Sequence, residues 1–590
     1  MKPDTPVQTR PLRPLLFALL SAAIGIVAGL GAVVFRALIG GVHNLAFLGQ
    51  WSTAYDANAH TPPSPWGIGV ILVPVVGAVI VAFIVKNFAP EAKGHGVPEV
   101  MDAIYYNRGR IRPVVALVKS LASAVSIGTG GSVGREGPII QIGSSFGSTI
   151  GQLLRVPAWQ RITLIAGGAG AGIAATFNTP VGGVLFVLET MMHEISVRTI
   201  VPVAIATAMA TYVGRLYFGP HPSFVVPGLE VPSFHATNPY VLLAYAALGV
   251  LMGGVAALFI RSIYATEDFF DQRIGGSYYR RHLLGMFLVG LVIYGLMATR
   301  GHYYVDGVGY STVQDILAGT PLTLTLLVTL FAMKLLATAL TLGSGASGGI
   351  FSPALFLGAT FGAAYGIVGG ILFPSLAFSA PAFALAGMAG LVGGATSAAM
   401  ASIVMIFEMT LDYNVIVPMT ITVAISYGVR RVLCHESIYT MKLVRRGHFL
   451  PEALRTGPQF VRRANEISLT KFGPLPAATT LAEFARLVSA DGSVPCFLVV
   501  DEGKPVGFVR SASAIEVLRD HRDGATLGEI AEKRFFTISG LASLYEVISE
   551  MHARGASLAL VAGEGGAVTG VISRERVADA VIESAELFRD

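Results

Sequence analysis

Long apolar runs alternate with short ones from about residue 14 to residue 433. The long runs include residues 66–86, 240–262 and 323–342. Each is long enough to cross the ~30 Å hydrocarbon core of a bilayer as a helix. The short runs are broken by glycine or proline and comprise residues 138–154, 162–177, 180–192 and 349–372. The pattern predicts more than a dozen helices, some of which are re-entrant and end inside the membrane.

The composition agrees with a multi-pass membrane protein. Only 13% of the 590 residues are charged and 53% are hydrophobic, whereas a soluble domain carries about 25% charged residues. The net charge of +5 favours membrane-flanking Lys and Arg over a nucleic-acid-binding patch. Cys434 and Cys496 have neither metal-ligand spacing nor a disulfide framework, so neither a metal nor a cofactor is expected.

Basic residues flank the apolar region at both ends. The N-terminal residues 1–13 contain Lys2, Arg10 and Arg13. After the last apolar run come Arg430, Arg431, Lys442, Arg445 and Arg446. Because such flanks stay in the cytoplasm, both termini are expected there, with an even number of crossings of the cell membrane.

A repeat relates two parts of the apolar region. Residues 128–147, GTGGSVGREGPIIQIGSSFG, align with residues 343–362, GSGASGGIFSPALFLGATFG, at an offset of 215. Eight of the twenty positions are identical, and the same offset pairs Lys119 with Lys334. Two repeats are typical of transporters, whose site lies where the repeats meet. We expect the repeats over about residues 14–235 and 236–445; the alignment leaves their relative orientation open.

The pattern changes after residue 445. Residues 446–469 are polar and basic, as in a linker. Residues 470–590 show a strand, turn, strand and helix pattern twice. They predict a soluble α/β unit built from a pseudo-symmetric pair.

Two adjacent charges, Arg135 and Glu136, interrupt an apolar run. A charge at membrane depth costs roughly 2.5–3.5 kcal/mol even on insertion scales. The pair lies in GSVGREGP (131–138), where glycines precede a proline that suits a first helical turn. The free N–H groups and the dipole of such a helix start favour an anion.

Two other segments follow the same pattern. SGGIFSP (347–353) has its first helical N–H groups around Ile350 and Phe351, and KGHGVPEV (93–100) precedes a third helix. The three helix starts predict one site for a dehydrated anion. Glu136 would block this site when ionised and leave it when protonated, so it would be both gate and proton carrier. The alternative is that Arg135 and Glu136 form a buried structural pair.

Together, GSVGREGP, SGGIFSP and KGHGVP resemble the motifs of the CLC chloride channels and transporters. Lys119 and ESIYTMKLVRRG (436–447) also fit. The resemblance covers about residues 14–445, and residues 470–590 resemble a CBS-domain pair. It implies an α-helical polytopic membrane protein of the CLC fold, with inverted repeats, broken re-entrant helices and a cytoplasmic α/β CBS pair. It also implies a homodimer with one pore per subunit, and a transporter of chloride and other anions rather than an enzyme.

The resemblance assigns roles to individual residues. Glu136 matches the gating glutamate. The backbone N–H groups of Gly134, Ile350 and Phe351 match those that bind the anion, and Arg135 lies in the same loop. Tyr439 matches the tyrosine whose hydroxyl contacts the central anion.

Two positions depart from the family pattern. His95 stands where a serine usually contacts the central anion; an imidazole N–H can also donate to chloride. Thr190 replaces the internal proton-transfer glutamate and follows Glu189. Because threonine does not titrate, we expect proton-gated, channel-like or loosely coupled chloride transport, with 2:1 chloride/proton antiport as the alternative.

Some residues have plainer interpretations. Glu189 and Glu408 are expected to bond helix ends, and Lys119 and Lys334 to be buried supports. In the CBS pair, Ser511 and Ser573 stand where a Ser/Thr usually precedes a ribose-binding Asp by three positions, but Ala514 and Arg576 replace the Asp. Adenine-nucleotide binding is therefore doubtful, although Arg576 would suit a more phosphorylated ligand.

Two remote alternatives belong to other classes of protein. GGSVG (130–134) and GASGG (345–349) both satisfy the G-x-S-x-G motif of serine hydrolases. An intramembrane protease would use a histidine such as His193 as its base. In the other alternative, the CBS pair is a nucleotide sensor and the membrane part is its transducer.

Overall fold

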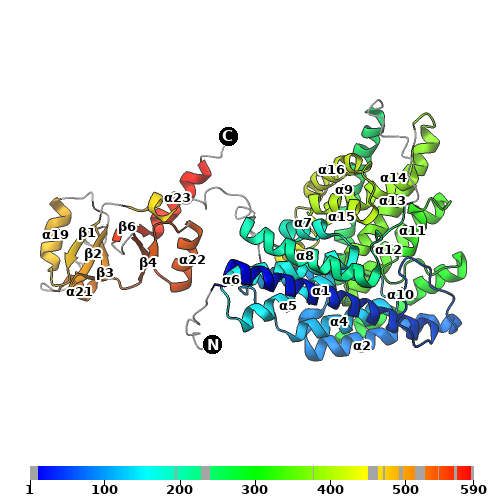
Figure 1. Ribbon diagram of the computed structural model, residues 1–590, viewed down its shortest axis with the longest axis horizontal. Coiled ribbons are helices and arrows are strands. Elements are labelled where there is room, and N and C mark those ends of the chain that lie inside the picture. The colour runs from blue at the N-terminus through cyan, green and yellow to red at the C-terminus, as the bar shows by residue number, and fades with distance from the viewer. Residues whose placement is uncertain are drawn as a thin grey trace. The chain divides into compact units, whose positions relative to one another are not determined.

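The computed structural model describes residues 11–192, 196–226, 239–376, 378–448, 463–469, 472–490, 494, 496–511, 525–542, 544–563 and 568–586. The chain divides into two compact units, Met1–Leu450 and Pro451–Asp590. Figure 1 shows the first as a bundle of helices and the second with strands β1 to β6. The division falls inside the expected linker.

Seventeen α-helices form the described part of the first unit. They are α1 (Pro14–His43), α2 (Val73–Phe88), α3 (Val97–Tyr105), α4 (Val114–Gly128), α5 (Glu136–Leu153), α6 (Ala158–Phe177), α7 (Pro180–Thr190), α8 (Val197–Phe218), α9 (Pro239–Arg273), α10 (Tyr278–Arg300), α11 (Tyr310–Leu317), α12 (Leu324–Ser344), α13 (Phe351–Leu372), α14 (Ala380–Thr396), α15 (Ala399–Thr410), α16 (Ile416–Leu433) and α17 (Thr440–Arg445). Three short helical segments, η1 (Asn44–Leu48), η2 (Gly67–Leu72) and η3 (Pro90–Ala92), join the first of them.

Helices α1–α8 and α9–α16 correspond one to one, in chain order and in their neighbours. Helix α5 packs on α6 as α13 packs on α14, and α1 packs on α8 as α9 packs on α16. The repeat seen in twenty aligned residues therefore extends through both halves of the unit. In Figure 1 the first half runs from blue to cyan and the second from green to yellow.

Eight described helices are long and apolar enough to cross a membrane, whereas α4, α7, α14 and α15 are apolar but have only 10–17 residues. Of the four runs predicted to be broken, only 180–192 forms such a short helix, α7, whereas residues 138–154 and 162–177 lie in α5 and α6, of 18 and 20 residues. The run 349–372 likewise forms one continuous helix, α13, of 22 residues. Its glycines serve helix contact instead: a Cβ at Gly362 would lie 2.2 Å from the Phe383 carbonyl oxygen of α14. Small residues at such contacts let two backbones approach closely.

Two small sheets of identical topology form the second unit. In the first sheet, β2 (Cys496–Asp501) pairs in parallel with β1 (Gly473–Pro476) and antiparallel with β3 (Lys504–Arg510). In the second sheet, β5 (Leu558–Ala562) pairs in the same way with β4 (Phe535–Ser539) and β6 (Val568–Ser573). The accompanying helices are α18 (Ala464–Ile467), α19 (Leu481–Ala490), α21 (Leu527–Ile530), α22 (Leu544–Arg554) and α23 (Arg574–Glu586).

The two sheets share a hydrophobic core. Leu498 and Phe508 of the first sheet cluster with Leu558, Leu560 and Val571 of the second. The predicted α/β pair is thus one packed unit.

Candidate anion and proton site

Three glycine-rich loops meet where the two halves of the membrane unit join. Gly134 and Gly349 exchange two backbone hydrogen bonds, with N···O distances of 2.7 and 2.6 Å. Gly94 donates to the Ala346 carbonyl (3.0 Å) and accepts from Gly348 (3.3 Å). The loops that precede α3, α5 and α13 therefore form one hydrogen-bonded frame, so the three predicted helix starts do lie together.

The Glu136 carboxylate lies at the start of α13. Its Oε2 accepts the backbone N–H of Ser352 (3.3 Å), and its Oε1 accepts the hydroxyl groups of Tyr310 (2.6 Å) and Ser352. The whole residue is 2% exposed. A carboxylate thus fills the place where a helix N-terminus would otherwise hold a free anion.

Gly134 differs from the expectation of a free N–H group, because its N–H is engaged by Gly349. Its lack of a side chain makes room instead, since a Cβ there would lie 2.1 Å from Oε2 of Glu136. Arg135 forms no ion pair with Glu136 among the described residues; its guanidinium lies 5.4 Å from the centre of the Tyr310 ring. The direct ion pair that the alternative expected between Arg135 and Glu136 is therefore not formed.

Ile350 and Phe351 form the first turn of α13, with Ile350 as N-cap. Both are almost fully buried. The Phe351 ring packs on Phe177 and Phe186, with centroid distances of 5.4 and 6.4 Å. This packing fixes the helix start whose N–H groups are predicted to bind the anion.

His95 is buried between two glycines of positive φ, Gly94 (82°) and Gly96 (86°). Its ring lies edge-on to Tyr264 at 6.3 Å. Its Nδ1 atom is buried and has no hydrogen-bond partner in the described part of the chain. A buried nitrogen without a protein partner is costly, and an anion in the pathway would supply the missing acceptor.

Tyr439 precedes α17 and is 2% exposed. Its ring lies 6.3 Å from that of Phe186, which also contacts Phe351. Tyr439 is therefore connected through one aromatic ring to the start of α13. The structure brings it to the same region as Glu136, and a role for its hydroxyl stays a prediction.

Comparisons with known proteins bear on this arrangement. The family described as "Voltage gated chloride channel" matches residues 77–431, and the CBS domain family matches residues 527–583. The H(+)/Cl(−) exchange transporter ClcA of Cronobacter sakazakii is 33% identical over 448 residues, which cover 74% of this chain and 91% of that protein.

The chain belongs to the CLC family.

Two solved structures share its fold. One is a slow cyanobacterial Cl−/H+ antiporter, with a TM-score of 0.62 and 26% identity over 74% of this chain and 98% of that one. The other is a eukaryotic CLC transporter, with a TM-score of 0.60 and 20% identity over 95% and 98%. The CLC fold with a C-terminal CBS region is thus established for this chain. Its relatives are transporters, not enzymes.

In this CLC chain, Thr190 ends α7 and is buried. Its hydroxyl donates to the Phe186 carbonyl oxygen at 2.6 Å. The hydroxyl proton is thus held by the helix, so Thr190 offers only acceptor capacity to a water molecule.

Glu189 and Glu408 have the structural role that the sequence predicted. Glu189 accepts the N–H groups of Met400 (3.0 Å) and Ala401 (2.8 Å) at the start of α15. Glu408, on α15, accepts those of Val181 (3.1 Å) and Gly182 (2.7 Å) at the start of α7. The two short helices α7 and α15 therefore cap each other.

The buried lysines pin the loops of the site. Lys119 donates to the carbonyls of Ala92 (3.0 Å) and Gly94 (2.7 Å), and both lysines are fully buried. Lys334 donates to the equivalent loop of the second half, at Val305 (3.1 Å) and Gly307 (3.0 Å). The prediction of buried supports is confirmed.

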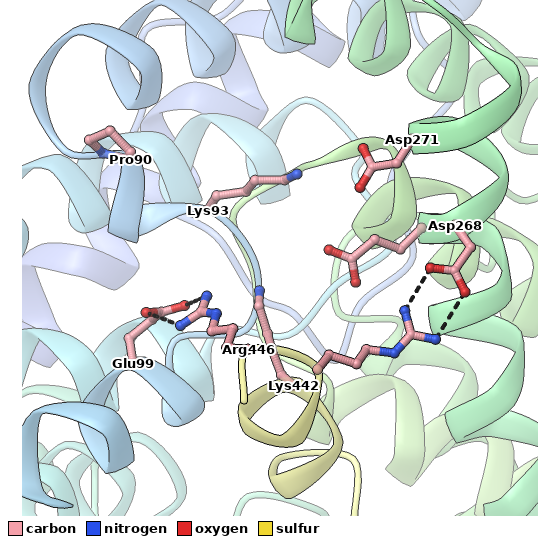
Figure 2. Close-up of a pocket in the computed structure, with 9 residues that line it drawn as sticks. Pro90, Lys93, Glu99, Asp268, Asp271, Lys442 and Arg446 are labelled. Carbon is pink, nitrogen blue, oxygen red and sulfur yellow. Dashed lines mark hydrogen bonds and ion pairs between the residues drawn. The ribbon is translucent and has the colours of Figure 1, made fainter. Parts of the chain in front are cut away.

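A charged pocket of about 290 Å³ lies beside the His95 loop (Figure 2). Two bidentate ion pairs, Arg446–Glu99 and Arg445–Asp268, stand at its walls. Figure 2 shows the ammonium groups of Lys93 and Lys442 directed into the space between them. A Cβ on Gly94 would lie 2.6 Å from Lys442 Nζ, so this lysine reaches from the pocket to the loop that carries His95.

Sequence reasoning missed Tyr310 and Ser352 as partners of Glu136. A signal was present for Tyr310, since GVGY (307–310) repeats the pattern of GHGV (94–97). Ser352 directly follows the two residues that were assigned to the anion site.

The serines of the protease motif serve the frame. Ser347 donates to the Ala92 carbonyl (2.7 Å) and contacts Ser123 (2.9 Å), and Ser132 Oγ lies 3.4 Å from Thr338 Oγ1. Neither is bonded to a histidine among the described residues, and His193 lies outside them. Within the described part of the chain, the protease alternative therefore finds no nucleophile and base pair.

In the CBS pair, the two serines at the ribose-motif position, Ser511 and Ser573, form local hydrogen bonds. Ser511 donates to the Val494 carbonyl, and Ser573 accepts the Arg576 N–H (3.2 Å). Hydrogen bonds from its own backbone N–H and from the Ser573 hydroxyl lower the pKa of Glu575 from its usual value. Arg576 Nε donates to the Ile467 carbonyl (3.1 Å). Ala514 lies outside the described residues.

Proposed function

We propose that this protein exchanges chloride for protons across a membrane. The observation that carries the proposal is the position of the Glu136 carboxylate, on the N–H of Ser352 at a helix start where an anion would bind. A carboxylate and a chloride ion then compete for one site, and protonation decides the competition. Such competition couples the movement of the two ions.

The relatives favour exchange over the channel-like alternative. ClcA of Cronobacter sakazakii is named an H(+)/Cl(−) exchange transporter, and a solved structure of the same fold is titled a Cl−/H+ antiporter. The replacement of the internal glutamate by Thr190 is the observation that favours a channel-like pathway. In an exchanger, protons would pass this position along a chain of water molecules, one of which would donate a hydrogen bond to the Thr190 hydroxyl.

The remaining assignments concern orientation and assembly. The pocket of Figure 2 gathers Lys93, Lys442, Arg445 and Arg446, so by the positive-inside rule it would open to the cytoplasm. Both termini would lie on that side. We assign the protein to the cell membrane as a homodimer with one pathway in each subunit.

A proton gradient alone tests the proposal. Liposomes that contain the protein would hold equal chloride on both sides, with the membrane voltage clamped at zero by a potassium ionophore. When the two sides differ in pH, an exchanger accumulates chloride on one side even though the chloride concentrations are equal at the start. A channel, even a proton-gated one, moves no net chloride under these conditions, and that result would overturn the proposal.

A further inference from the structure

We propose that the hydroxyl groups of Tyr310 and Ser352 form a latch that holds the ionised Glu136 carboxylate in the anion site. The latch sets how much acid is needed to release the gate. The inference rests on Glu136 as the gate, and it holds whether the pathway is an exchanger or a channel.

The two hydroxyl groups converge on one carboxylate oxygen. Tyr310 OH lies 2.6 Å from Glu136 Oε1 and 2.6 Å from Ser352 Oγ, which itself donates to the same Oε1. An ionised carboxylate only accepts hydrogen bonds, so it can accept one from each of the two hydroxyl groups at once. Protonation makes the carboxyl group a donor and a weaker acceptor. The latch therefore favours the ionised form of Glu136.

Tyr310 is held in place by contacts other than Glu136. Its ring packs edge-on against Phe224 at 5.3 Å and lies 6.4 Å from Phe177. The loop before it is fixed by Lys334, and Gly309 adopts a φ of 74° that directs the chain into α11. Because the hydroxyl is already positioned, little conformational entropy is lost when the carboxylate docks.

The fold does not require a tyrosine at this position. The equivalent loop of the first half, Gly94–His95–Gly96, leads into α3 with Val97 at the first helical position. Valine starts that helix without a hydroxyl group. The phenol of Tyr310 is thus free of a helix-starting role and serves the gate as a positioning group.

Other charged and titratable groups also face the carboxylate. Arg135 precedes it in the chain, Lys334 approaches from α12, and Tyr439 lies before α17. All three remain unchanged in the variants below. A change in acid sensitivity can therefore be assigned to the hydroxyl that was removed.

The test compares the pH dependence of chloride flux in liposomes for the wild type, Tyr310→Phe and Ser352→Ala. Each variant removes a donor from the ionised carboxylate, so the gate should be protonated at higher pH. We expect the midpoint of acid activation to move upward by about one pH unit for each variant, from the typical strength of a hydrogen bond to a charged group. Tyr365→Phe is the matched control, because it loses a hydrogen bond to the Ala244 carbonyl (2.9 Å) away from the site. Its midpoint should not move.

A second comparison separates the latch from the gate. Adding Tyr310→Phe to Glu136→Gln should leave the flux as independent of pH as in Glu136→Gln alone. If Tyr310→Phe and Ser352→Ala lower the flux equally at every pH, or move the midpoint downward, the latch is overturned. If Glu136→Gln keeps the wild-type pH dependence, the gate itself is wrong, which is a different outcome.

Discussion

The two halves of the membrane unit share one backbone arrangement, a glycine-rich loop before a short helix, but differ in the side chains that it carries. Each has a glycine-X-glycine loop, residues 94–96 and 307–309, in which both glycines have positive φ. Each loop leads into a short helix, α3 or α11, and is pinned by one fully buried lysine, Lys119 or Lys334. The frame is duplicated to the level of individual hydrogen bonds.

The side chains of the two loops have diverged. The first loop carries His95, whose Nδ1 has no partner in the described chain, and ends in Val97. The second carries Val308 and ends in Tyr310, which donates to Glu136. One half therefore carries a buried nitrogen without a partner among the described residues, while the other carries a hydroxyl group that donates to Glu136. The two halves thus have the same loop backbone, and they differ in the few polar side chains that the loops carry.

Removing the charge that the second loop secures should have the largest effect. Glu136→Gln mimics the protonated carboxyl, which has no net charge to hold at the helix start. We expect chloride flux that no longer depends on pH, with proton-driven chloride accumulation abolished. Flux assays in liposomes measure both. The control is Glu550→Gln, an exposed glutamate of α22 in the CBS unit. Flux through Glu136→Gln that stayed as pH-dependent as the wild type would place the gate elsewhere.

The equivalence of the two frames is tested by the buried lysines. Lys119→Met and Lys334→Met each leave two loop carbonyls without their donor. Because an unsatisfied buried group costs about 1–3 kcal/mol, both variants should unfold at clearly lower temperature than the wild type in detergent. Lys86→Met, at an exposed position of α2, should not. A loss of stability in only one of the two buried-lysine variants would show that the halves are not equivalent.

The frame could be predicted from the sequence because it depends on glycine, proline and lysine at fixed spacing. Residues 128–147 and 343–362 showed the repeat, and glycine before proline marked the helix starts. The capping roles of Glu189 and Glu408 followed from the same logic, because a carboxylate near a short helix has N–H groups to satisfy.

What the sequence did not show depends on distances between separate helices. Ser352 and Tyr310 reach Glu136 from α13 and α11, and no local pattern joins these three residues. The engagement of the Gly134 N–H by Gly349 likewise needs the packed structure. Adjacency in the chain suggested an Arg135–Glu136 pair, yet successive residues of a helix start point in different directions.

The first loop should respond to substitution more weakly than the gate. If the unpartnered nitrogen of His95 donates to an anion, His95→Ser should change the permeability ratio of chloride to nitrate by roughly three- to tenfold, since one hydrogen bond contributes about 1 kcal/mol. Bi-ionic potentials or competitive uptake measure the ratio. His435→Ser is the control, because that side chain is 65% exposed. Unchanged ratios would place His95 off the anion pathway.

The CBS pair is the second duplicated unit of the chain, and here we expect no effect. Its copies also share a frame, and both lack the Asp of a ribose site, with Ala514 and Arg576 at that position. The Ser511 hydroxyl donates to the Val494 carbonyl oxygen. The Ser573 hydroxyl accepts the Arg576 N–H and forms a hydrogen bond with the Glu575 carboxylate. Arg576 stands where an Asp would grip a ribose, and its Nε is bonded to Ile467. Titration calorimetry of the full-length protein with ATP, ADP or AMP should therefore show no binding in the micromolar range. Micromolar affinity that Ser573→Ala removes would contradict this prediction and would assign a nucleotide site to Ser573.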